Sequence, residues 1–470
     1  MSDPFTSADT ADPAFNTTTH DGRLISAVYE QLAQFDESLK AVPSLAQSWE
    51  VNETATLWTF KLREGVTFHD GDRFTAADVV HTYQRLLDPD AGSPGAGSLD
   101  SLLDPDGVSA IDDRTVHFSL KQAHVDFPLA TVFRQAYIIP EGAGGELATA
   151  PVGTGPFKVP EFVAGEQTTF VKNENYWQEG LPRVDAIELL SITEAAARVA
   201  ALQRGQVDVI EAPPFTELSA FESNPDTKLA TQPKGNMPLI AMQTDVPPFD
   251  DNRVRLAMKY AMDRQGMLDL VAQGFGTLVN DVPIASLLQY ALPGPPRPRD
   301  VDMAKQLLSE AGFPNGIDVS LKVSDVQAGF IDFATVYQQQ AAEAGINVEL
   351  DVRPADTYWD TVWLQEPMFV SAYISRPTDG MLGLLYPSGA DWNETHWFRE
   401  DWDALLAEAR STLDPAERIA VYQRAQQILV DEGGHLVPYM VSTIDAVRAN
   451  VTWQPSGTPF HNFAALDIDV

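Results

Sequence analysis

Strand-like and helix-like patterns alternate along most of this chain, and that alternation restricts the folds open to it. In "LWTFKL", Trp58 and Phe60 stand at alternate positions, which is the period of a half-buried strand. Shortly afterwards, Val79 and Tyr83 stand at helical spacing. The alternation predicts a mixed α/β fold and argues against a repeat array or an all-β sandwich.

The segment between this strand and this helix holds a histidine and two aspartates, His69, Asp70 and Asp72, which are residue types of a metal or acid–base site. However, Asp70 is followed by glycine, and Asp-Gly is a common tight-turn pair because glycine adopts positive φ without a Cβ clash. Thr75 and Asp78 then have the spacing of a helix-capping motif. We therefore predict a turn and a helix start here, and no metal site.

In the second half of the chain, predicted strands follow predicted helices. The stretches "DVDMAKQLLSEAG" and "FATVYQQQAAEAG" end in Ala-Gly, and glycine commonly ends a helix in the left-handed conformation. "IDVSLKVS" and "INVELDVRP" follow them as strands, which predicts a parallel sheet. A last long helix is predicted from Asp414-Pro415 to a Gly-Gly pair.

At 470 residues the chain is too long for one compact core, so more than one domain is expected. Proline and glycine concentrate near residue 235, which is the first candidate crossing between domains. The strand pair predicted in "HLVPYMVSTIDAVRANVTW" has no partner nearby in the sequence, and a return to the first domain would supply one. We predict that lobe one comprises residues 1–236 and 441–470 and that lobe two comprises residues 237–440. Two neighbouring crossings imply a hinge, and a hinge implies a ligand cleft between the lobes.

The composition excludes several kinds of partner. The 31 Lys and Arg against 67 Asp and Glu give a formal net charge of −36, which repels nucleic acid and anionic membranes. This acidity either attracts cationic ligands or adapts the protein to a saline habitat, and composition leaves both open. The absence of cysteine excludes disulfides, thiolate metal sites and a cysteine nucleophile. The sequence has no apolar run of about 18 residues that would span a membrane.

The motifs of common enzyme classes are missing. The sequence contains no G-x-S-x-G, no H-E-x-x-H and no G-x-x-x-x-G-K-[ST]. Its "GTGPF" segment lacks the lysine and the helix start of a phosphate loop. The 8 histidines are not clustered, which argues against a His-rich metal site. We therefore expect no catalysis, no cofactor and no metal, with a secreted hydrolase as a remote alternative.

Seven segments carry a resemblance that covers nearly the whole chain: "VYEQLAQFDESLKAVPSLAQSWE", "FHDGDRFTAADVV", "PVGTGPFKV", "NENYWQEGLPRVDAIEL", "ALQRGQVDVIEAPP", "PPFDDNRVRLAMKYAMDRQGM" and "RIAVYQRAQQILVDEGGHLVPYM". In this order they resemble the extracytoplasmic solute-binding proteins of peptide- and nickel-type ABC transporters, family 5, the dipeptide- and oligopeptide-binding class. The resemblance implies a two-lobed α/β fold like that of large type II periplasmic binding proteins, with an extra subdomain in lobe one at roughly residues 45–170.

The resemblance also implies a function. A member of this family is the substrate-binding component of an ABC importer: a monomer that captures a peptide or another amine-bearing solute and delivers it to membrane permease subunits without catalysis. Opines, oligosaccharides and metal chelates are alternative solutes on the same fold. Similarity to the family further implies a periplasmic location, with a signal peptide already removed. Family members usually have a strand such as "GTLRVA" before the "DP" segment, where this chain has "MSDPFTSADTADPAF", so the first strand is expected to be absent or altered.

By the same resemblance, candidate ligand-binding residues lie in both lobes. In "AYISRPTDGML" of lobe two, Asp379 is placed to pair with the α-amine of a peptide, beside Arg376 and Tyr373. A carboxylate buried on closure of the lobes needs a cation, which is either the ligand or Arg376. This segment differs from the "GDPDN" type of dipeptide binders.

The other candidates are polar loop residues and aromatic residues. Thr18, Thr19 and His20 lie on an N-terminal loop, where capping of the next helix is the alternative role for His20. Asn393 and Trp397 match an "N-x-S-x-W" element of the family, and Trp359 lies in "DTYWDTVW". Aromatic rings would give a ligand apolar walls and cation–π faces, although a core would use them equally well.

Overall fold

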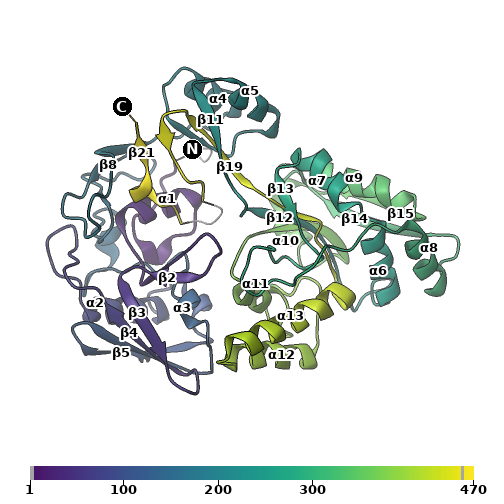
Figure 1. Ribbon diagram of the computed structural model, residues 1–470, viewed down its shortest axis with the longest axis horizontal. Helices are drawn as coiled ribbons and strands as arrows, with labels where there is room; N and C mark the ends of the chain where they lie inside the picture. The colour runs from purple at the N-terminus through teal and green to yellow at the C-terminus, as the bar shows by residue number, and fades with distance from the viewer. Residues whose placement is uncertain (1–4, 457–459, 470) are drawn as a thin grey trace. The chain divides into compact units, whose positions relative to one another are not determined.

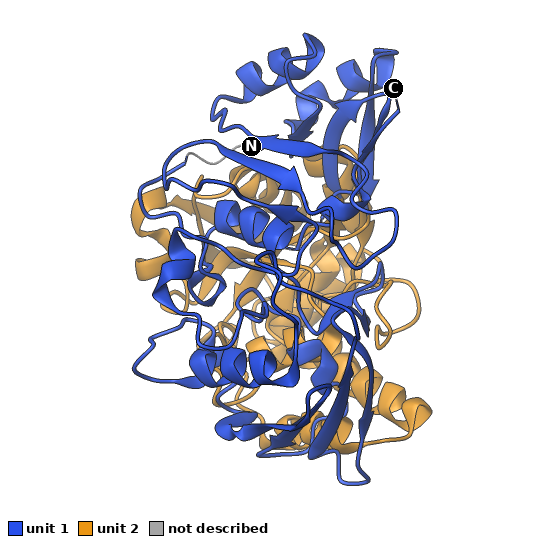
Figure 2. Ribbon diagram, turned by 90° about the vertical axis from the view of Figure 1, so that its left-hand side faces the viewer, with its two compact units in different colours: residues 1–232, 443–470 blue, residues 233–442 orange. Residues whose placement is uncertain are grey.

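The computed structural model describes residues 5–456 and 460–469 of the chain, which forms two compact units (Figure 2). Unit 1 comprises Met1–Gln232 and Thr443–Val470, and unit 2 comprises Pro233–Ser442. The chain therefore passes between the units after Gln232 and after Ser442, where the sequence analysis placed the crossings after residues 236 and 440.

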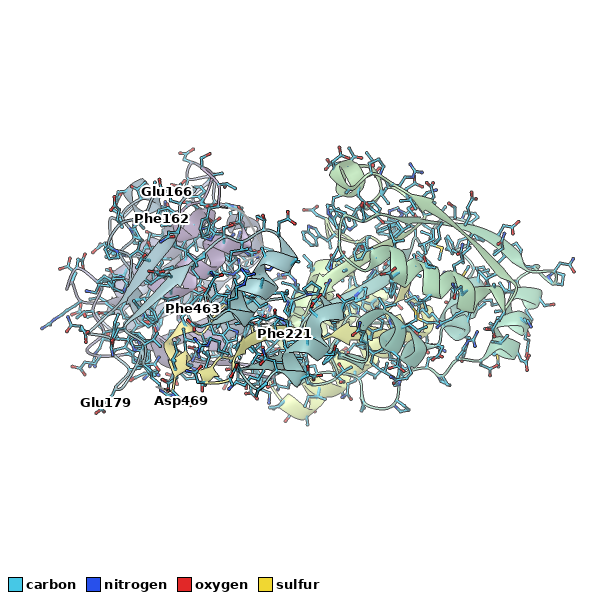
Figure 3. All side chains as sticks on the ribbon, turned by 90° about the horizontal axis from the view of Figure 1, so that it is seen from above. Phe162, Glu166, Glu179, Phe221, Phe463 and Asp469 are labelled. Atoms are coloured by element: carbon cyan, nitrogen blue, oxygen red, sulfur yellow. The ribbon has the colours of Figure 1, made fainter. Side chains whose placement is uncertain are left out.

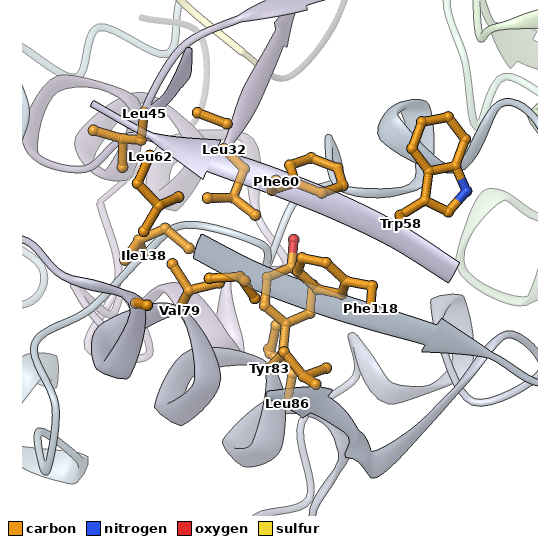
Figure 4. Close-up of a cluster of buried hydrophobic side chains, with 14 of the residues drawn as sticks. Leu32, Leu45, Trp58, Phe60, Leu62, Val79, Tyr83, Leu86, Phe118 and Ile138 are labelled. Atoms are coloured by element: carbon orange, nitrogen blue, oxygen red, sulfur yellow. The ribbon is translucent and has the colours of Figure 1, made fainter. Parts of the chain in front are cut away.

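The largest sheet of unit 1 is antiparallel and has the strand order β3-β4-β6-β5. Its strands are β3 (Ala46–Val51), β4 (Leu57–Leu62), β5 (Leu103–Asp112) and β6 (Thr115–Leu120). Helix α2 (Ala76–Leu87) packs on this sheet and shares its core, in which Phe60, Tyr83 and Phe118 lie together (Figure 4). The alternating pattern predicted for residues 57–62 is confirmed, because the side chains of β4 alternate between half-buried and buried positions.

The segment between β4 and α2 forms the predicted turn. Gly71 has a φ of 102°, which glycine adopts without strain, and its N–H donates to the carbonyl of Phe68. The predicted cap is confirmed, because Thr75 and Asp78 form a capping box at the start of α2. His69 Nε2 lies 2.9 Å from the carbonyl oxygen of Gly155, and burial lowers the pKa of His69 to about 4. These contacts give the residues of the segment a structural role.

The rest of unit 1 forms smaller sheets. A three-stranded sheet has the order β7-β8-β9, another has the order β10-β19-β11, and two pairs are β1-β2 and β20-β21. The strands are β1 (Ala33–Phe35), β2 (Ala41–Pro43), β7 (Phe157–Lys158), β8 (Thr168–Lys172), β9 (Ala186–Leu189), β10 (Val209–Glu211), β11 (Thr227–Gln232), β19 (Thr443–Arg448), β20 (Val451–Thr452) and β21 (Asp467–Ile468). The helices are α1 (Thr19–Val28), α3 (Phe127–Ala130), α4 (Ala195–Gln203) and α5 (Leu218–Ser223).

Two further hydrophobic cores hold these smaller sheets. Phe463 packs in the core that contains α1, and Phe221 packs in the core of the β10-β19-β11 sheet, whereas Glu166 and Glu179 point outward (Figure 3). Ahead of α1, residues 5–18 contain one short 3₁₀ helix, Pro13–Phe15, and no strand.

Unit 2 is built on a five-stranded sheet with the order β15-β14-β16-β12-β17 (Figure 1). The strands of the unit are β12 (Asn236–Met242), β13 (Gly276–Leu278), β14 (Ile317–Val323), β15 (Ile346–Val352), β16 (Met368–Ile374), β17 (His435–Leu436) and β18 (Tyr439–Val441). The predicted parallel pairing is confirmed, because β14 pairs in parallel with β15 and with β16. The strand β12 runs antiparallel to β16 and β17.

The helices of unit 2 follow the sequence signals closely. They are α6 (Asn252–Ala261), α7 (Arg264–Ala272), α8 (Val301–Glu310), α9 (Phe330–Ala342), α10 (Tyr358–Thr361), α11 (Thr378–Leu385), α12 (Glu400–Ser411) and α13 (Pro415–Glu432). Asp414 caps α13 as predicted, and α12 and α13 lie side by side (Figure 1). None of the helices in residues 5–456 and 460–469 has the length and apolarity needed to cross a membrane.

The return to unit 1 takes place within the predicted strand pair, close to the predicted crossing after residue 440. The strands β17 and β18 stay in unit 2, where they pair with β12 and β13. Only β19 and the residues after it belong to unit 1, where β19 pairs with β10 and β11. The apolar run hides this division, because consecutive buried strands in one run do not reveal which sheet each of them joins.

Cationic side chains of α6 and of the loop after α7 bind the carboxyl end of α13. Arg255 donates to the carbonyl of Glu432, Lys259 to those of Leu429 and Val430, and Arg297 also to that of Val430. The last carbonyls of a helix have no partner within the helix and carry its partial negative charge. Two basic residues of the family segment "NRVRLAMK", Arg255 and Lys259, therefore join α6 to α13.

This arrangement predicts that the stability of the protein depends on pH through Lys259. Burial lowers the pKa of Lys259 from 10.5 to about 7 in the folded state. Between these values the unfolded chain binds the extra proton, so stability should rise with pH from about 7 to 10. Urea unfolding of the wild type and of Lys259→Met should show a difference in unfolding free energy that grows by roughly 2–4 kcal/mol over this range. If the unfolding free energies of the wild type and of Lys259→Met change in parallel between pH 7 and 10, the predicted role of Lys259 is wrong.

Candidate functional site

The strand β16 carries several of the predicted ligand-binding residues to one end of the unit 2 sheet. It lies between β14 and β12, and its backbone path continues past Ile374, because the Ser375 N–H donates to the carbonyl of Gly235 at 2.9 Å. After Pro377 the chain enters α11. In α/β sheets, ligands commonly bind beyond the carboxyl ends of strands, so this end is the place to look for a site.

Several buried polar atoms between residues 375 and 397 have no hydrogen-bond partner among the described residues. They include Ser375 Oγ, Thr378 Oγ1, Thr395 Oγ1 and Trp397 Nε1. Each of these four residues is at most 3% exposed. Buried polar groups in folded proteins nearly always have a partner, so an unpaired group calls for an explanation. Ser375 lies beside Gly235, which precedes β12, whereas Thr395 lies beside Thr244, which follows β12, so these atoms do not form one cluster.

Asp379, the predicted amine partner, has an internal cation in the structure. Arg410 of α12 donates from Nε to Asp379 Oδ1 at 2.8 Å and from its second nitrogen to Oδ2 at 3.1 Å, and the Tyr422 hydroxyl donates to Oδ1 at 2.8 Å. Gly383 leaves the room for this pair, because a Cβ there would lie 2.3 Å from the Arg410 guanidinium. The amine-binding role of Asp379 stays a prediction, but any ligand amine would have to compete with Arg410.

A cluster of aromatic rings lies next to a second buried carboxylate. Trp363 and Trp392 are 5.2 Å apart at an interplanar angle of 82°, and the rings of Tyr373 and Trp392 are 6.2 Å apart. We name these three side chains the aromatic corner. Trp363 Nε1 donates to Glu394 at 2.7 Å, and Glu394 is 0% exposed while Trp392 is 39% exposed. The corner therefore has a solvent-accessible ring and a buried carboxylate bound to one of its members.

His435 and Tyr386 lie next to Glu394. His435 Nε2 lies 2.9 Å from Glu394 Oε1, and His435 Nδ1 lies 2.5 Å from the Tyr386 hydroxyl. Burial, followed by the charge of Glu394, raises the pKa of Tyr373. The site therefore has a buried, hydrogen-bonded carboxyl group next to the aromatic corner.

The loop that carries Trp392 and Glu394 is held by its own hydrogen bonds. Asn393 Oδ1 accepts the Trp397 N–H at 2.9 Å, and Asn393 Nδ2 donates to the Trp397 carbonyl at 3.0 Å. The carbonyl of Thr395 accepts the N–H of Thr244, which follows β12. These bonds give Asn393 a local structural role, while the indole N–H of Trp397 is one of the unpaired groups above.

The remaining predicted residues lie elsewhere. Trp359 is 40% exposed and packs edge to face with Phe330 and Tyr358, which are outside the aromatic corner. In unit 1, Thr18 is the N-cap of α1 and forms a capping box with Asp21, so the helix-capping alternative is realised by these two residues.

The other two residues of the N-terminal loop differ in burial. Thr19 is exposed, while His20 is buried, with Nε2 3.5 Å from an oxygen of Asp9 and its ring tilted against that of Phe5 at 4.6 Å. Tyr373 belongs to the aromatic corner, Asn393 and Trp397 lie in the loop that carries Trp392, and Arg376 and Asp379 lie at the start of α11.

Sequence reasoning missed Glu394, Arg410, Ser375 and Thr378. Glu394 lies inside the quoted element "DWNETHW". An acidic residue between two tryptophans could have been recognised there as a candidate buried carboxylate. Arg410 gave no such signal, because it comes from a helix 31 residues after Asp379.

Comparison with known proteins supports the fold and shows the family. A model of the bacterial extracellular solute-binding proteins, family 5, middle region, matches residues 40–394. A glutathione-binding protein of Pectobacterium atrosepticum is 30% identical over 85% of this chain and 80% of its own length. The di/tripeptide-binding protein 1 of Pseudomonas aeruginosa is 28% identical over 96% of this chain and 89% of its own.

A solved structure extends the similarity to the three-dimensional fold. The binding protein AgaA of A. tumefaciens R10, in complex with agropinic acid, has a TM-score of 0.78, with 26% sequence identity over 100% of this chain and 97% of its own. The predicted two-lobed α/β fold of periplasmic binding proteins is thereby confirmed.

The Asp379–Arg410 pair predicts a specific coupling of stabilities. Arg410→Met should lower the free energy of unfolding by about 2–4 kcal/mol, because it removes the cation that binds both oxygens of a buried carboxylate. Adding Asp379→Asn should recover at least half of the loss, as measured by urea unfolding. The matched control is Arg424→Met, which breaks the exposed Arg424–Glu408 pair between α13 and α12 and should cost less than about 1 kcal/mol. A double variant no more stable than Arg410→Met would contradict the coupling.

Proposed function

Because this chain belongs to the bacterial extracellular solute-binding proteins of family 5, we propose that it captures a peptide or another amine-bearing small solute and delivers it to the permease of an ABC importer. Relatives named for glutathione and for di- and tripeptides support this class of solute. The protein would act outside the cytoplasmic membrane as a monomer and release the solute unchanged.

The observation that carries the proposal is the aromatic corner above Glu394. A cation over the face of a tryptophan or tyrosine ring gains about 0.5–2 kcal/mol, with the larger value when the cation loses its water. A carboxylate in a low-dielectric environment strengthens that attraction, and Glu394 is 0% exposed. Trp392 presents its ring to solvent, so an ammonium group can reach the corner without opening the core.

A second candidate solute is an opine. The structure of AgaA with agropinic acid supports it, because that protein shares 26% identity with this chain over 100% of its length. Peptides and opines can be told apart by a thermal-shift screen, since a ligand raises the melting temperature by an amount that grows with the logarithm of its concentration relative to Kd. The same incubations, analysed for products, test for catalysis: recovery of every solute unchanged is expected, and turnover of any of them would contradict a transport role.

The amine requirement gives the sharpest test. We expect N-acetylation of a bound solute to weaken binding at least about 10-fold, because the acetylated nitrogen no longer offers a cation to the aromatic corner. For Trp392→Leu, calorimetric titration should give dissociation constants for the free and the acetylated solute that differ by less than about 3-fold. Trp359→Leu is the matched control, because Trp359 is equally exposed at 40% but packs on Phe330. Equal affinities of the wild type for both forms would rule out this role of the corner.

A further inference from the structure

The sequence contains four Asn-x-Thr triplets, which is the acceptor motif for N-linked glycosylation in exported proteins. They begin at Asn16, Asn52, Asn393 and Asn450. The motif alone is a weak signal, because it is short and arises by chance in many chains. In a folded protein, a transferase needs access to the side-chain amide, which surface turns provide and the core does not. The structure therefore separates the four triplets.

Three of the four asparagines hold their amide nitrogen away from a transferase. Asn16 is 1% exposed and Asn393 is 5% exposed. The Nδ2 of each donates to a backbone carbonyl at 3.0 Å. Asn450 is half-buried, and its Nδ2 donates to another backbone carbonyl at 2.8 Å. In all three, the nitrogen that would receive a sugar is bound to a carbonyl outside its own triplet.

The fourth asparagine, Asn52, lies on the turn between β3 and β4 (Figure 1). Asn52, Glu53 and Thr54 are all exposed. The Nδ2 of Asn52 donates to the Thr54 hydroxyl at 2.9 Å, which is the hydroxyl of its own triplet. The strand before the turn, β3, is at the edge of the β3-β4-β6-β5 sheet, so within the described residues no strand pairs with its other edge. Asn52 therefore combines an accessible position with a hydrogen bond inside the motif.

The turn also fixes the orientation of the Asn52 amide. Its Oδ1 accepts the N–H of Thr56 at 3.0 Å and the N–H of Leu57 at 3.1 Å. The oxygen of a side-chain amide accepts and the nitrogen donates, so these two donors identify the oxygen and place Nδ2 next to the Thr54 hydroxyl. Asparagine side chains commonly hold turns through bonds of this kind to the following backbone. The amide is thus held from its oxygen side.

From these observations we infer that the protein is glycosylated at Asn52, and not at the buried asparagines of the other triplets. The Nδ2 of Asn52 attacks the anomeric carbon of a lipid-phosphate-linked sugar that a membrane-bound glycosyltransferase presents. A bond forms between Nδ2 and that carbon, and the bond from the carbon to the phosphate oxygen breaks. The lipid phosphate leaves with the electron pair, and the amide proton passes to a base of the transferase. Thr54 is a positioning residue, because its hydroxyl acts through Nδ2.

This inference goes beyond the proposed function, because no solute takes part in it. The two share only the location outside the cytoplasmic membrane. If no solute binds but Asn52 carries a sugar, the transport role fails and the glycosylation site stands. If a solute binds but Asn52 is unmodified, the glycosylation site fails alone.

The chain contains its own comparison for the test. The triplets at Asn52 and at Asn393 are both Asn-Glu-Thr, so they differ in burial and not in the motif. The protein is purified from a culture of its natural host and digested, and its peptides are analysed by mass spectrometry. The peptide with Asn52 should carry a sugar chain, whereas the peptide with Asn393 should not. An unmodified Asn52 would overturn the inference, and so would a sugar chain on Asn393.

Three variants produced in the same host test the role of the Thr54 hydroxyl. Thr54→Val removes it and should abolish the sugar at Asn52, whereas Thr54→Ser keeps a hydroxyl and should retain the sugar. The matched control is Thr56→Val, because the Thr56 hydroxyl lies 2.7 Å from that of Thr54 but is outside the triplet. This variant should also retain the sugar. A sugar chain that persists at Asn52 in Thr54→Val, or that is lost in Thr56→Val, would contradict the assignment.

Discussion

The ion pair between Asp379 and Arg410 decides what the end of β16 can bind. Asp379 lies in the first turn of α11, where a free carboxylate would attract an amine and would also compensate the helix dipole. Arg410 and Tyr422 occupy both of its oxygens, so the carboxylate is neutralised within unit 2. A ligand amine that binds Asp379 therefore has to compete with Arg410, whereas Glu394 lies next to the aromatic corner.

Local signals in the sequence predicted local structure well. The alternating residues of β4, the Asp-Gly turn, the capping box of Thr75 and Asp78, and the start of α13 at Asp414-Pro415 are all present in the structure. Each depends on residues within a few positions of one another, so a single sequence contains all of the information. The pairing of β17 and β18 with unit 2 depends on strands about 195 and about 160 residues away, and no nearby pattern records it.

The candidate site was harder to predict for the same reason. The resemblance named Tyr373, Arg376 and Asp379 as candidates, but the role of a carboxylate depends on its counter-ion. That counter-ion, Arg410, comes from another helix and is admitted by the missing side chain of Gly383. The unpaired hydroxyls of Ser375 and Thr378 are likewise invisible in a sequence, because satisfaction of a polar atom is a property of packing.

A crystal structure of the protein with a bound solute tests the central claim most directly. The account predicts that the solute's ammonium group lies within about 6 Å of the Trp392 ring. In that structure Arg410 still binds Asp379. An ammonium group bound to Asp379, with Arg410 displaced from the carboxylate, would contradict the account.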